Sequence, residues 1–242
     1  MTQPHFTIII PCFNAGLLLS GALESIERWG GSCEVIVVDG GSSDETSQIV
    51  KKFSKQVTHF VSEPDSGIYD AMNKGVRLAQ GRFFYFLGAD DRLAVSLKSI
   101  EPIIQDVNTI YYGRVRLQPS GRLLGGYSSR TRLLFRNISH QAIFYPCGVF
   151  NRHFYEPLIQ VCADHALNLE LAFDTHYCWQ YIPDCIVADF AEGGVSSKIW
   201  DASFEKFRRN FIFSKGTWFE KSLFSLWDRL RRKPSQESNQ CH

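Results

Sequence analysis

Short apolar runs that end in polar turns alternate with amphipathic segments over the first 92 residues. Runs rich in β-branched or aromatic residues predict buried strands, and the segments between them have the apolar spacing of helices. The predicted strands are Phe6–Pro11, Glu34–Asp39, Val57–Ser62 and Phe83–Leu87; the predicted helices are Leu17–Trp29, one from Ser43 or Asp44 to about Lys55, and one that begins at Asp65 or Ser66. This alternation predicts a Rossmann-like, doubly wound, mostly parallel α/β sheet.

The pattern is less regular beyond residue 92. It predicts helices over Leu97–Gln105 and Asp164–Phe173, strands over Thr109–Leu117, Ala142–Phe150, Trp179–Ile182 and Ile186–Asp189, and a turn or hairpin at Gly121–Gly126. Residues 201–232 predict two helices broken near Gly216, and the polar tail after Pro234 is expected to be disordered. We therefore expect one domain over residues 1–197, followed by a helical extension and tail over residues 198–242.

The 242 residues are enough for one α/β domain with its own core. The formal net charge of +1 hides an asymmetry: residues 1–197 carry 16 Lys/Arg and 20 Asp/Glu, and residues 198–242 carry 10 and 5. Without a basic stripe, the larger part is not expected to bind nucleic acid.

The seven cysteines include no C-x-x-C pair, so neither a disulfide framework nor a zinc site is predicted, and a reducing cytosol suits this pattern. The first residues lack the basic stretch of a signal peptide, and no run approaches the roughly 20 apolar residues that span a bilayer. We expect a cytoplasmic protein.

Two of the predicted strands end in acidic residues, Asp39 on the second and Asp90-Asp91 after the fourth. Ligands of doubly wound sheets bind beyond the carboxyl ends of the strands, so we expect the chemistry there. Adjacent carboxylates at the end of an apolar strand repel each other and are partly desolvated, and Mg²⁺ or Mn²⁺ would relieve both effects. The alternative is a solvated acidic turn in which Asp91 caps the next helix.

Asp39 precedes Gly40-Gly41, a turn where backbone can approach a ligand closely. An acid in this place can accept hydrogen bonds from ribose or a base, although a β-turn that merely needs glycine explains the residues as well. The turn after the first strand lacks G-x-G-x-x-G, and there is no Walker A sequence. Asp164 opens a predicted helix, either as the base that deprotonates an acceptor hydroxyl or as the N-cap.

Other polar residues are weaker candidates. Lys74 could offset phosphate charge and Asn73 could bond sugar hydroxyls, or both could lie on the wet face of an amphipathic helix. His140 and Gln141, just before a predicted strand, are candidates for contact with a diphosphate or an acceptor. The backbone of Gly193-Gly194 could cradle an anion or simply connect two elements.

Taken in order, these segments resemble the family-2 glycosyltransferases of the GT-A fold, and most of all the bacterial branch that builds cell-surface polysaccharides of the colanic-acid type. The resemblance covers about residues 6 to 197 and rests on the order and spacing of the whole set of motifs. They are T-I-I-I-P-C-F-N, V-I-V-V-D-G-G-S-S-D-E-T, S-G-I-Y-D-A-M-N-K-G, G-R-F-F-Y-F-L-G-A-D-D, S-H-Q-A-I-F-Y, A-D-H-A-L-N-L and E-G-G-V-S-S.

The resemblance implies an inverting, metal-dependent enzyme that moves a sugar from a nucleotide-diphosphate sugar to a hydroxyl acceptor, with a lipid-linked saccharide as the expected acceptor. It makes Asp164 the catalytic base and Asp91 the metal ligand. The donor-binding residues that it implies are Pro11, Phe13, Asn14, Asp39 and Asp90. Gly88 stands where many members have another acid, so a strict D-x-D motif is absent.

Residues 198–233 interleave Phe and Trp with Lys and Arg. Such a segment suits a helix in an anionic membrane interface, which would place the protein on the inner face of the plasma membrane. Alternatively, its aromatic side chains pack on the catalytic domain and its charges face water.

Two other functions were weighed. A nucleotidyltransferase would need a glycine-rich, basic loop after the first strand, but Cys12–Leu17 contains no Lys or Arg. A catalytically silent sugar-binding module would not need the three acids Asp39, Asp91 and Asp164 together.

Overall fold

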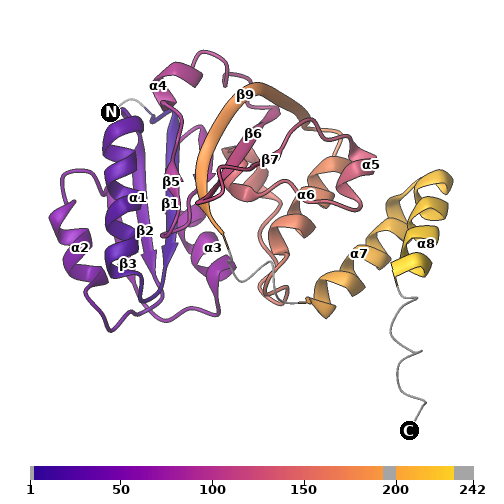
Figure 1. Cartoon of the computed structure of the whole chain (residues 1–242), viewed down its shortest axis with the longest axis horizontal. Helices are drawn as coiled ribbons and strands as arrows, with labels where there is room; N and C mark the ends of the chain where they lie inside the picture. The colour runs from indigo at the N-terminus through magenta and orange to yellow at the C-terminus, as the bar shows by residue number, and fades with distance from the viewer. Residues whose placement is uncertain (1–2, 193–199, 232–242) are drawn as a thin grey trace, which may run out of the picture.

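The computed structural model describes residues 3–192 and 200–231. In this part of the chain one mixed sheet has the strand order β3-β2-β1-β4-β8-β6-β9-β5, with β7 paired to β6 (Figure 1). The strands are β1 (Phe6–Cys12), β2 (Glu34–Asp39), β3 (His59–Ser62), β4 (Phe83–Phe86), β5 (Arg92–Leu93), β6 (Thr109–Gln118), β7 (Leu123–Gly125), β8 (Ile143–Pro146) and β9 (Cys178–Ala191). The helices are α1 (Gly16–Trp29), α2 (Thr46–Lys52), α3 (Ile68–Leu78), α4 (Leu97–Ile100), α5 (Arg130–Leu133), α6 (Ala163–Phe173), α7 (Ala202–Lys215) and α8 (Trp218–Arg231).

Strands β3, β2, β1 and β4 pair in parallel, and helices cover both faces of this half of the sheet (Figure 1). Alternate side chains of a strand point to opposite faces. Accordingly, Val35 and Val37 of β2 pack in the main core with α1, whereas Ile36 and Val38 pack against Ala71 of α3. This confirms the predicted doubly wound arrangement.

A glycine lets α3 approach the sheet closely. A Cβ on Gly75 would lie 2.4 Å from Cγ2 of Ile9 and 3.4 Å from Cγ2 of Val38. The first turn of α3 is thereby held near the carboxyl ends of β1 and β2.

The second half of the sheet departs from the sequence prediction in three places. The helix expected over Leu97–Gln105 is only the short α4, and the strand expected over Ala142–Phe150 is β8 followed by a 3₁₀ turn, Cys147–Asn151. The two short strands expected near residues 179–189 are one long strand, β9. It continues through Pro183-Asp184 because Asp184 adopts a φ of +57° and the register with β6 shifts nearby, as in a bulge.

The long strand β9 matters for function because its carboxyl end, Phe190-Ala191, reaches the edge of the sheet where β1 and β4 end. The domain boundary expected at residues 197 and 198 and the polar tail beyond Pro234 lie outside the described residues.

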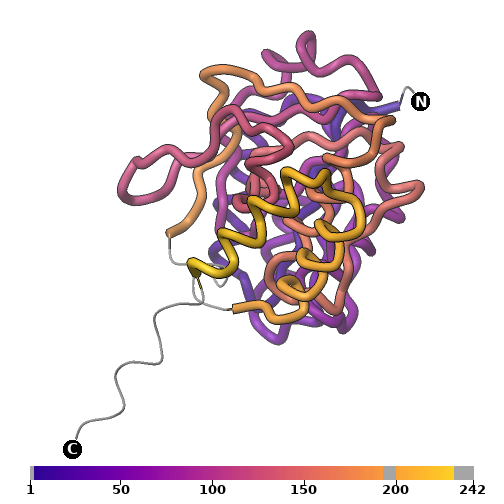
Figure 2. Tube along the Cα trace, turned by 90° about the vertical axis from the view of Figure 1, so that its right-hand side faces the viewer, coloured from indigo at the N-terminus to yellow at the C-terminus, as the bar shows by residue number. Residues whose placement is uncertain are grey.

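Helices α7 and α8 lie against the body at the end of the molecule opposite α2 (Figures 1 and 2). Phe224 is 1% exposed, and its ring lies 6.3 Å from that of Phe135, centroid to centroid. The Arg130 Nε lies 3.0 Å from Oε1 of Glu220. One face of the extension therefore belongs to the core of the domain, as the packing alternative expected.

We predict that Phe224→Ala lowers the free energy of unfolding by about 3–5 kcal/mol, because it opens a cavity among buried rings. The matched change Phe219→Ala, at a side chain 61% exposed on the same helix, is expected to cost less than about 1 kcal/mol. Urea unfolding followed by circular dichroism measures both. A Phe224→Ala variant with the wild-type midpoint would show that the extension is not part of the cooperative unit.

Candidate active site

A cavity of about 590 Å³ opens where the carboxyl ends of β1 and β4 meet. Its walls come from six segments far apart in the chain. They are Pro11–Ala15 with Leu18, Asp65 with Gly67–Tyr69 and Ala71, Gly88–Asp90, His140-Gln141, Gln160-Val161 and Phe190-Ala191. The chain reverses its strand order at this point, since β2 lies on one side of β1 and β4 on the other. This is the switch point at which doubly wound sheets bind ligands.

Asp39 ends β2 beside this cavity, is 1% exposed and is hydrogen-bonded within the protein. It accepts from the backbone N–H of Ser42 at 3.1 Å, from the Ser42 hydroxyl, and from the Ser62 hydroxyl at 2.7 Å. Ser42 Oγ in turn accepts from the backbone N–H of Asn14, a lining residue, at 2.7 Å. Asp39 therefore fixes the turn after β2, which through Ser42 holds the turn that carries Asn14. Gly41, in the turn after β2, has a φ of +86° that favours glycine.

Asp91 is buried beneath the cavity floor, at 1% exposure, whereas its neighbour Asp90 is exposed and lines the cavity. Asp91 accepts from Nε2 of Gln141 at 2.9 Å and from the backbone N–H of Ala191 at 3.1 Å. Burial, with the charge of Asp90 added, raises the pKa of Asp91 to about 6. The alternative of a solvated turn is wrong for Asp91, and the next helix, α4, begins after Ser96 instead.

The space that a third acid of a D-x-D motif would need is filled by these two carboxylates. A Cβ on Gly88 would lie 2.5 Å from Oδ2 of Asp91 and 3.0 Å from Oδ1 of Asp90. The two carboxylate oxygens thus converge on one point.

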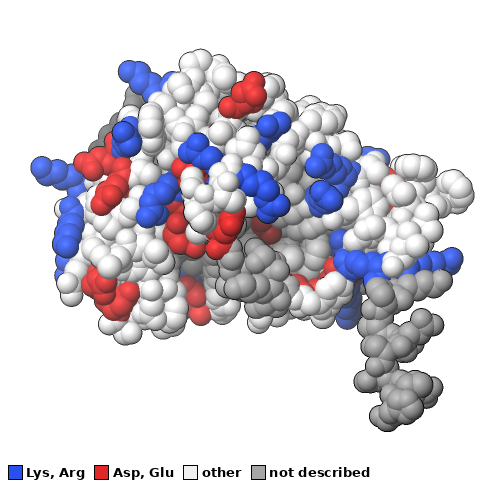
Figure 3. Space-filling view, in the orientation of Figure 1, with Lys and Arg blue, Asp and Glu red and all other residues white. Residues whose placement is uncertain are grey.

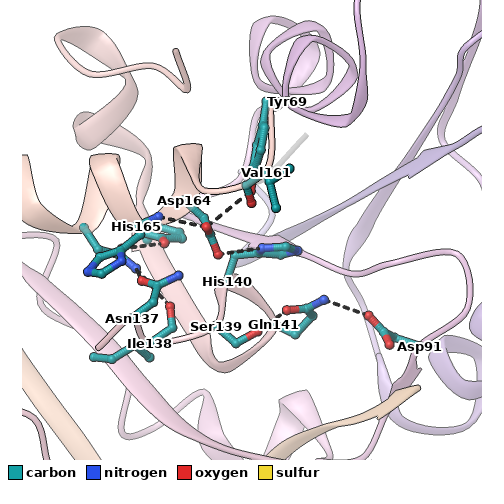
Figure 4. Close-up of polar contacts among 12 residues, drawn as sticks. Tyr69, Asp91, Asn137, Ile138, Ser139, His140, Gln141, Val161, Asp164 and His165 are labelled. Carbon is teal, nitrogen blue, oxygen red and sulfur yellow. Dashed lines mark hydrogen bonds and ion pairs between the residues drawn. The ribbon is translucent and has the colours of Figure 1, made fainter. Parts of the chain in front are cut away.

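Asp164 lies in the first turn of α6, where a carboxylate complements the helix dipole. The N-cap of α6 is Cys162, so the alternative reading of Asp164 as the N-cap is wrong. Oδ1 of Asp164 accepts from the Tyr69 hydroxyl at 3.2 Å and from the backbone N–H of His165 at 2.8 Å (Figure 4). Oδ2 lies 3.2 Å from Nδ1 of His140.

The pKa of Asp164 lies below its usual value although the residue is buried. Burial alone would raise the pKa, but the hydrogen bond and charge of His140, the charge of His165 and the backbone N–H of His165 outweigh it. Asp164 is therefore a carboxylate. Asp164 does not line the cavity itself, but it contacts Tyr69 and His140, which do. These contacts are its hydrogen bonds to the Tyr69 hydroxyl and the His140 ring.

Most of the candidates from the sequence come together here. Pro11, Phe13, Asn14, Asp90, His140 and Gln141 line the cavity. Asp39, Asp91 and Asp164 contact the lining residues Cys12, Gln141 and Tyr69. Two others do not. The Asn73 amide is buried and bonds both the carbonyl and the N–H of Tyr155, and Lys74 bonds Glu63 at 3.0 Å and the Pro64 carbonyl at 2.7 Å. Gly193 and Gly194 lie outside the described residues.

The sequence prediction missed Asp65 and Tyr69 as site residues. Asp65 and Phe13 both lie against Gly40. A Cβ on Gly40 would be 2.6 Å from Oδ2 of Asp65 and 3.3 Å from the Phe13 ring. The position of Asp65 in the polar turn between strand and helix was a usable signal. For Tyr69 there was none, because its partner Asp164 is 95 residues away.

Within residues 3–192 and 200–231 no group of three or more His, Cys, Asp and Glu side chains could hold a metal by itself. The convergent oxygens of Asp90 and Asp91 nevertheless fit an ion that takes few protein ligands and completes its shell with water and phosphate, as Mg²⁺ commonly does.

Comparison with known proteins gives the family. The family model described as "Glycosyl transferase family 2" matches residues 7–182. The chain belongs to this family. Membership in this family excludes the nucleotidyltransferase alternative. It agrees with the sequence motifs that resembled family-2 glycosyltransferases.

Two kinds of relative define this glycosyltransferase further. It is 38% identical over 217 residues to a "PGL/p-HBAD biosynthesis glycosyltransferase" of Mycobacterium bovis. The matched region covers 85% of this chain and 84% of that protein. Its fold is similar to that of residues 1–349 of S. aureus TarS in complex with UDP-GlcNAc, with a TM-score of 0.69 and 19% identity over 86% of this chain and 65% of that one. It spans only 39% of the longer TarS chain.

A second solved structure of similar fold is the mannosyltransferase PcManGT from Pyrobaculum calidifontis in complex with GDP-Man and Mn²⁺. The TM-score is 0.62 at 16% identity, over 93% of this chain and 65% of that one. The sheet of this glycosyltransferase is thus the GT-A fold, as the resemblance implied.

We predict that Asp91→Asn stabilises the metal-free glycosyltransferase more at pH 7 than at pH 4. Because the folded pKa of Asp91 is raised, the folded state binds more protons than the unfolded state between about pH 4 and pH 6, so the wild type loses stability as the pH rises through that window. The shift of about two units corresponds to roughly 3 kcal/mol.

The measurement is urea unfolding in a chelator at several pH values, with Asp184→Asn at an exposed site as the control. A difference in unfolding free energy between Asp91→Asn and the wild type that does not change with pH would contradict the prediction.

Proposed function

We propose that this family-2 glycosyltransferase moves a sugar from a nucleotide-diphosphate sugar to a hydroxyl acceptor with inversion at the anomeric carbon. The observation that carries the proposal is the grouping of Asp39, Asp91 and Asp164 around one cavity at the switch point of the sheet. An inverting transfer is a single displacement, which needs a base on the acceptor side and charge stabilisation on the side of the leaving diphosphate.

The donor nucleoside would lie against Pro11 and the Phe13 ring, which is 64% exposed and free to stack on a base. Asp65 lies on the same wall and offers a carboxylate to the N–H groups of the base. Asp90, which also lines the cavity, would bond the ribose hydroxyls. Asp39 would act on the nucleoside by holding the turn that carries Asn14, because its own oxygens are bonded to Ser42 and Ser62.

Asp91 and Asp90 would hold Mg²⁺ or Mn²⁺ through their carboxylate oxygens, which both lie close to Gly88. When bound, the ion offsets the negative charge that develops on the departing diphosphate. The elevated pKa of Asp91 supports this assignment, since a buried acid beside a second acid is stabilised by a cation.

Asp164 would serve the acceptor side as the carboxylate on which deprotonation of the hydroxyl depends. It is ionised, buried and hydrogen-bonded to two residues of the cavity wall.

We predict that Asp164→Asn lowers kcat by about 10²–10⁴-fold, the usual contribution of a general base, and leaves donor affinity within about threefold. The assay follows release of the nucleoside diphosphate from UDP-, GDP- and dTDP-sugars, with octyl glycosides as acceptors. Donor binding is followed as Mn²⁺-dependent thermal stabilisation. Glu170→Gln, two turns further along α6, is the matched control and should keep wild-type turnover.

Normal turnover by Asp164→Asn would remove the acceptor-side role. If no nucleotide-sugar stabilises the wild type with or without Mn²⁺, the donor assignment is wrong.

The acceptor would be a lipid-linked saccharide at the inner face of the plasma membrane, reached through peripheral contact of α8. None of the helices in the described ranges combines the length and apolar character needed to cross a bilayer. However, α8 exposes apolar side chains on the face opposite Phe224: Phe219 is 61%, Leu226 56% and Leu230 66% exposed. Their spacing of seven and four residues places them on one helical stripe.

The charges around this stripe fit an anionic lipid surface. Arg229 is exposed on the last turn of α8, and Lys215 is exposed at the end of α7, whereas Arg231 pairs with Glu205 at 3.1 Å. Figure 3 shows basic side chains along one edge of the α7–α8 pair beside a largely uncharged surface. An apolar stripe flanked by cations is the pattern of a helix that lies in a membrane interface.

We predict that Phe219→Ser with Leu226→Ser weakens binding to phosphatidylglycerol-containing vesicles more than about tenfold, because each change removes apolar area from the lipid contact. A deletion of both helices would remove buried Phe204 and Phe224 and uncover their partners His165 and Phe135, so substitutions are the sharper test. Ile103→Ser with Leu158→Ser, at exposed apolar positions elsewhere, is the control. Equal vesicle binding by both double variants would refute the proposed contact between the apolar stripe and lipid. Wild-type binding that is unchanged by high salt would refute the proposed attraction between the basic side chains and anionic lipid.

A further inference from the structure

The group that meets the cavity beside Asp164 is the imidazole of His140. Asp164 is not itself among the lining residues, and each of its oxygens already has protein partners. His140 lines the cavity, and its Nδ1 is the atom turned toward Asp164 (Figure 4).

The partners of Asp164 fix which ring nitrogen carries the proton in neutral His140. An ionised carboxylate only accepts hydrogen bonds, so Nδ1 must donate to Oδ2. Nε2 is then unprotonated, with its lone pair directed away from Asp164. This is the arrangement of a histidine that is oriented by an acid and ready to accept a proton.

Nε2 of His140 also lacks a partner. It is buried and has no hydrogen bond to any described residue. A buried acceptor without a donor is unfavourable, so such atoms often mark a functional site. A hydroxyl group bound in the cavity next to the ring would supply the missing donor.

We propose that Nε2 of His140 takes the proton of the acceptor hydroxyl, and that Asp164 is the positioning residue that orients the ring and stabilises the imidazolium. The inference rests on the proposed function and changes which atom receives the proton.

The step balances without any other reagent. The acceptor O–H bond breaks and its proton goes to Nε2, while the oxygen forms a bond to the anomeric carbon. The bond from that carbon to the diphosphate oxygen breaks, and its electron pair leaves with the nucleoside diphosphate. The imidazolium beside Asp164 returns its proton to water after the product leaves.

His140→Asn separates the two roles. The Asn amide can replace Nδ1 as the donor to Asp164, but it has no group in the place of Nε2. If His140 is the base, kcat for transfer from whichever UDP-, GDP- or dTDP-sugar the wild type uses to octyl glycosides falls about 10²–10⁴-fold, with donor affinity and melting temperature close to the wild type. If Asp164 takes the proton directly, His140→Asn keeps kcat within about tenfold, and the proposal is overturned.

The matched control is His153→Asn. The Nδ1 of His153 also lies 3.2 Å from a carboxylate oxygen, of Glu170, but His153 does not line the cavity. This variant should keep kcat within about twofold.

A double-mutant cycle tests whether Asp164 acts through His140. In the His140→Asn background, adding Asp164→Asn should lower kcat by less than about threefold, although Asp164→Asn alone is severe. A further loss as large as in the wild-type background would show that Asp164 has an independent role as the base.

Chemical rescue gives a readout that a structural role would not move. Imidazole added to His140→Ala should restore turnover at least about tenfold, and substituted imidazoles should restore it in the order of their basicity. No rescue in a folded, donor-binding His140→Ala variant would count against the proposal. Failure of the wild type to bind or use any nucleotide-sugar would overturn the proposed function instead, and this inference with it.

Discussion

Burial of three carboxylates at one edge of the sheet is the condition on which the rest of the structure depends. A carboxylate withdrawn from water is strongly unfavourable unless hydrogen-bond donors or cations replace the water. Ser42 and His165 are local donors to Asp39 and Asp164. The other donors come from segments distant in the chain: Ser62 for Asp39, Gln141 and Ala191 for Asp91, and Tyr69 and His140 for Asp164. The whole sheet must therefore form before the site exists.

The same condition gives the C-terminal extension a place in the site. Asp201 caps α7 through the Phe204 N–H and also accepts from the backbone N–H of Val161 at 2.9 Å. Val161 lines the cavity and comes three residues before Asp164. The helix pair that exposes an apolar stripe is thus tied to the segment that carries Asp164. Both alternatives weighed for the aromatic tail have a physical basis, because one face packs on the domain and the other is exposed.

The first half of the fold could be predicted because its signals are local. The apolar run Glu34–Asp39 and the helical spacing of Leu17–Trp29 do not depend on distant residues. The same holds later in the chain for the helical spacing that follows Asp164. The remainder could not be predicted because it depends on tertiary pairing. Asn73 looked like a sugar ligand, but it bonds the backbone of Tyr155, 82 residues away. His140 was a lone histidine in the sequence, and only the placement of β8 beside β4 brings it to Asp164.

Gly88 and the segment His140-Gln141 together explain why the site lacks a third acid. Oδ2 of Asp91, held by Gln141, occupies the space that a Cβ at position 88 would take. The next residue back, His140, contacts Asp164 (Figure 4). Two adjacent residues therefore contact Asp91 and Asp164, the carboxylates proposed for the metal side and the acceptor side. The proposed inversion would require attack and departure on opposite faces of one carbon, and a single short segment that spaces the two carboxylates would be a direct way to fix that geometry.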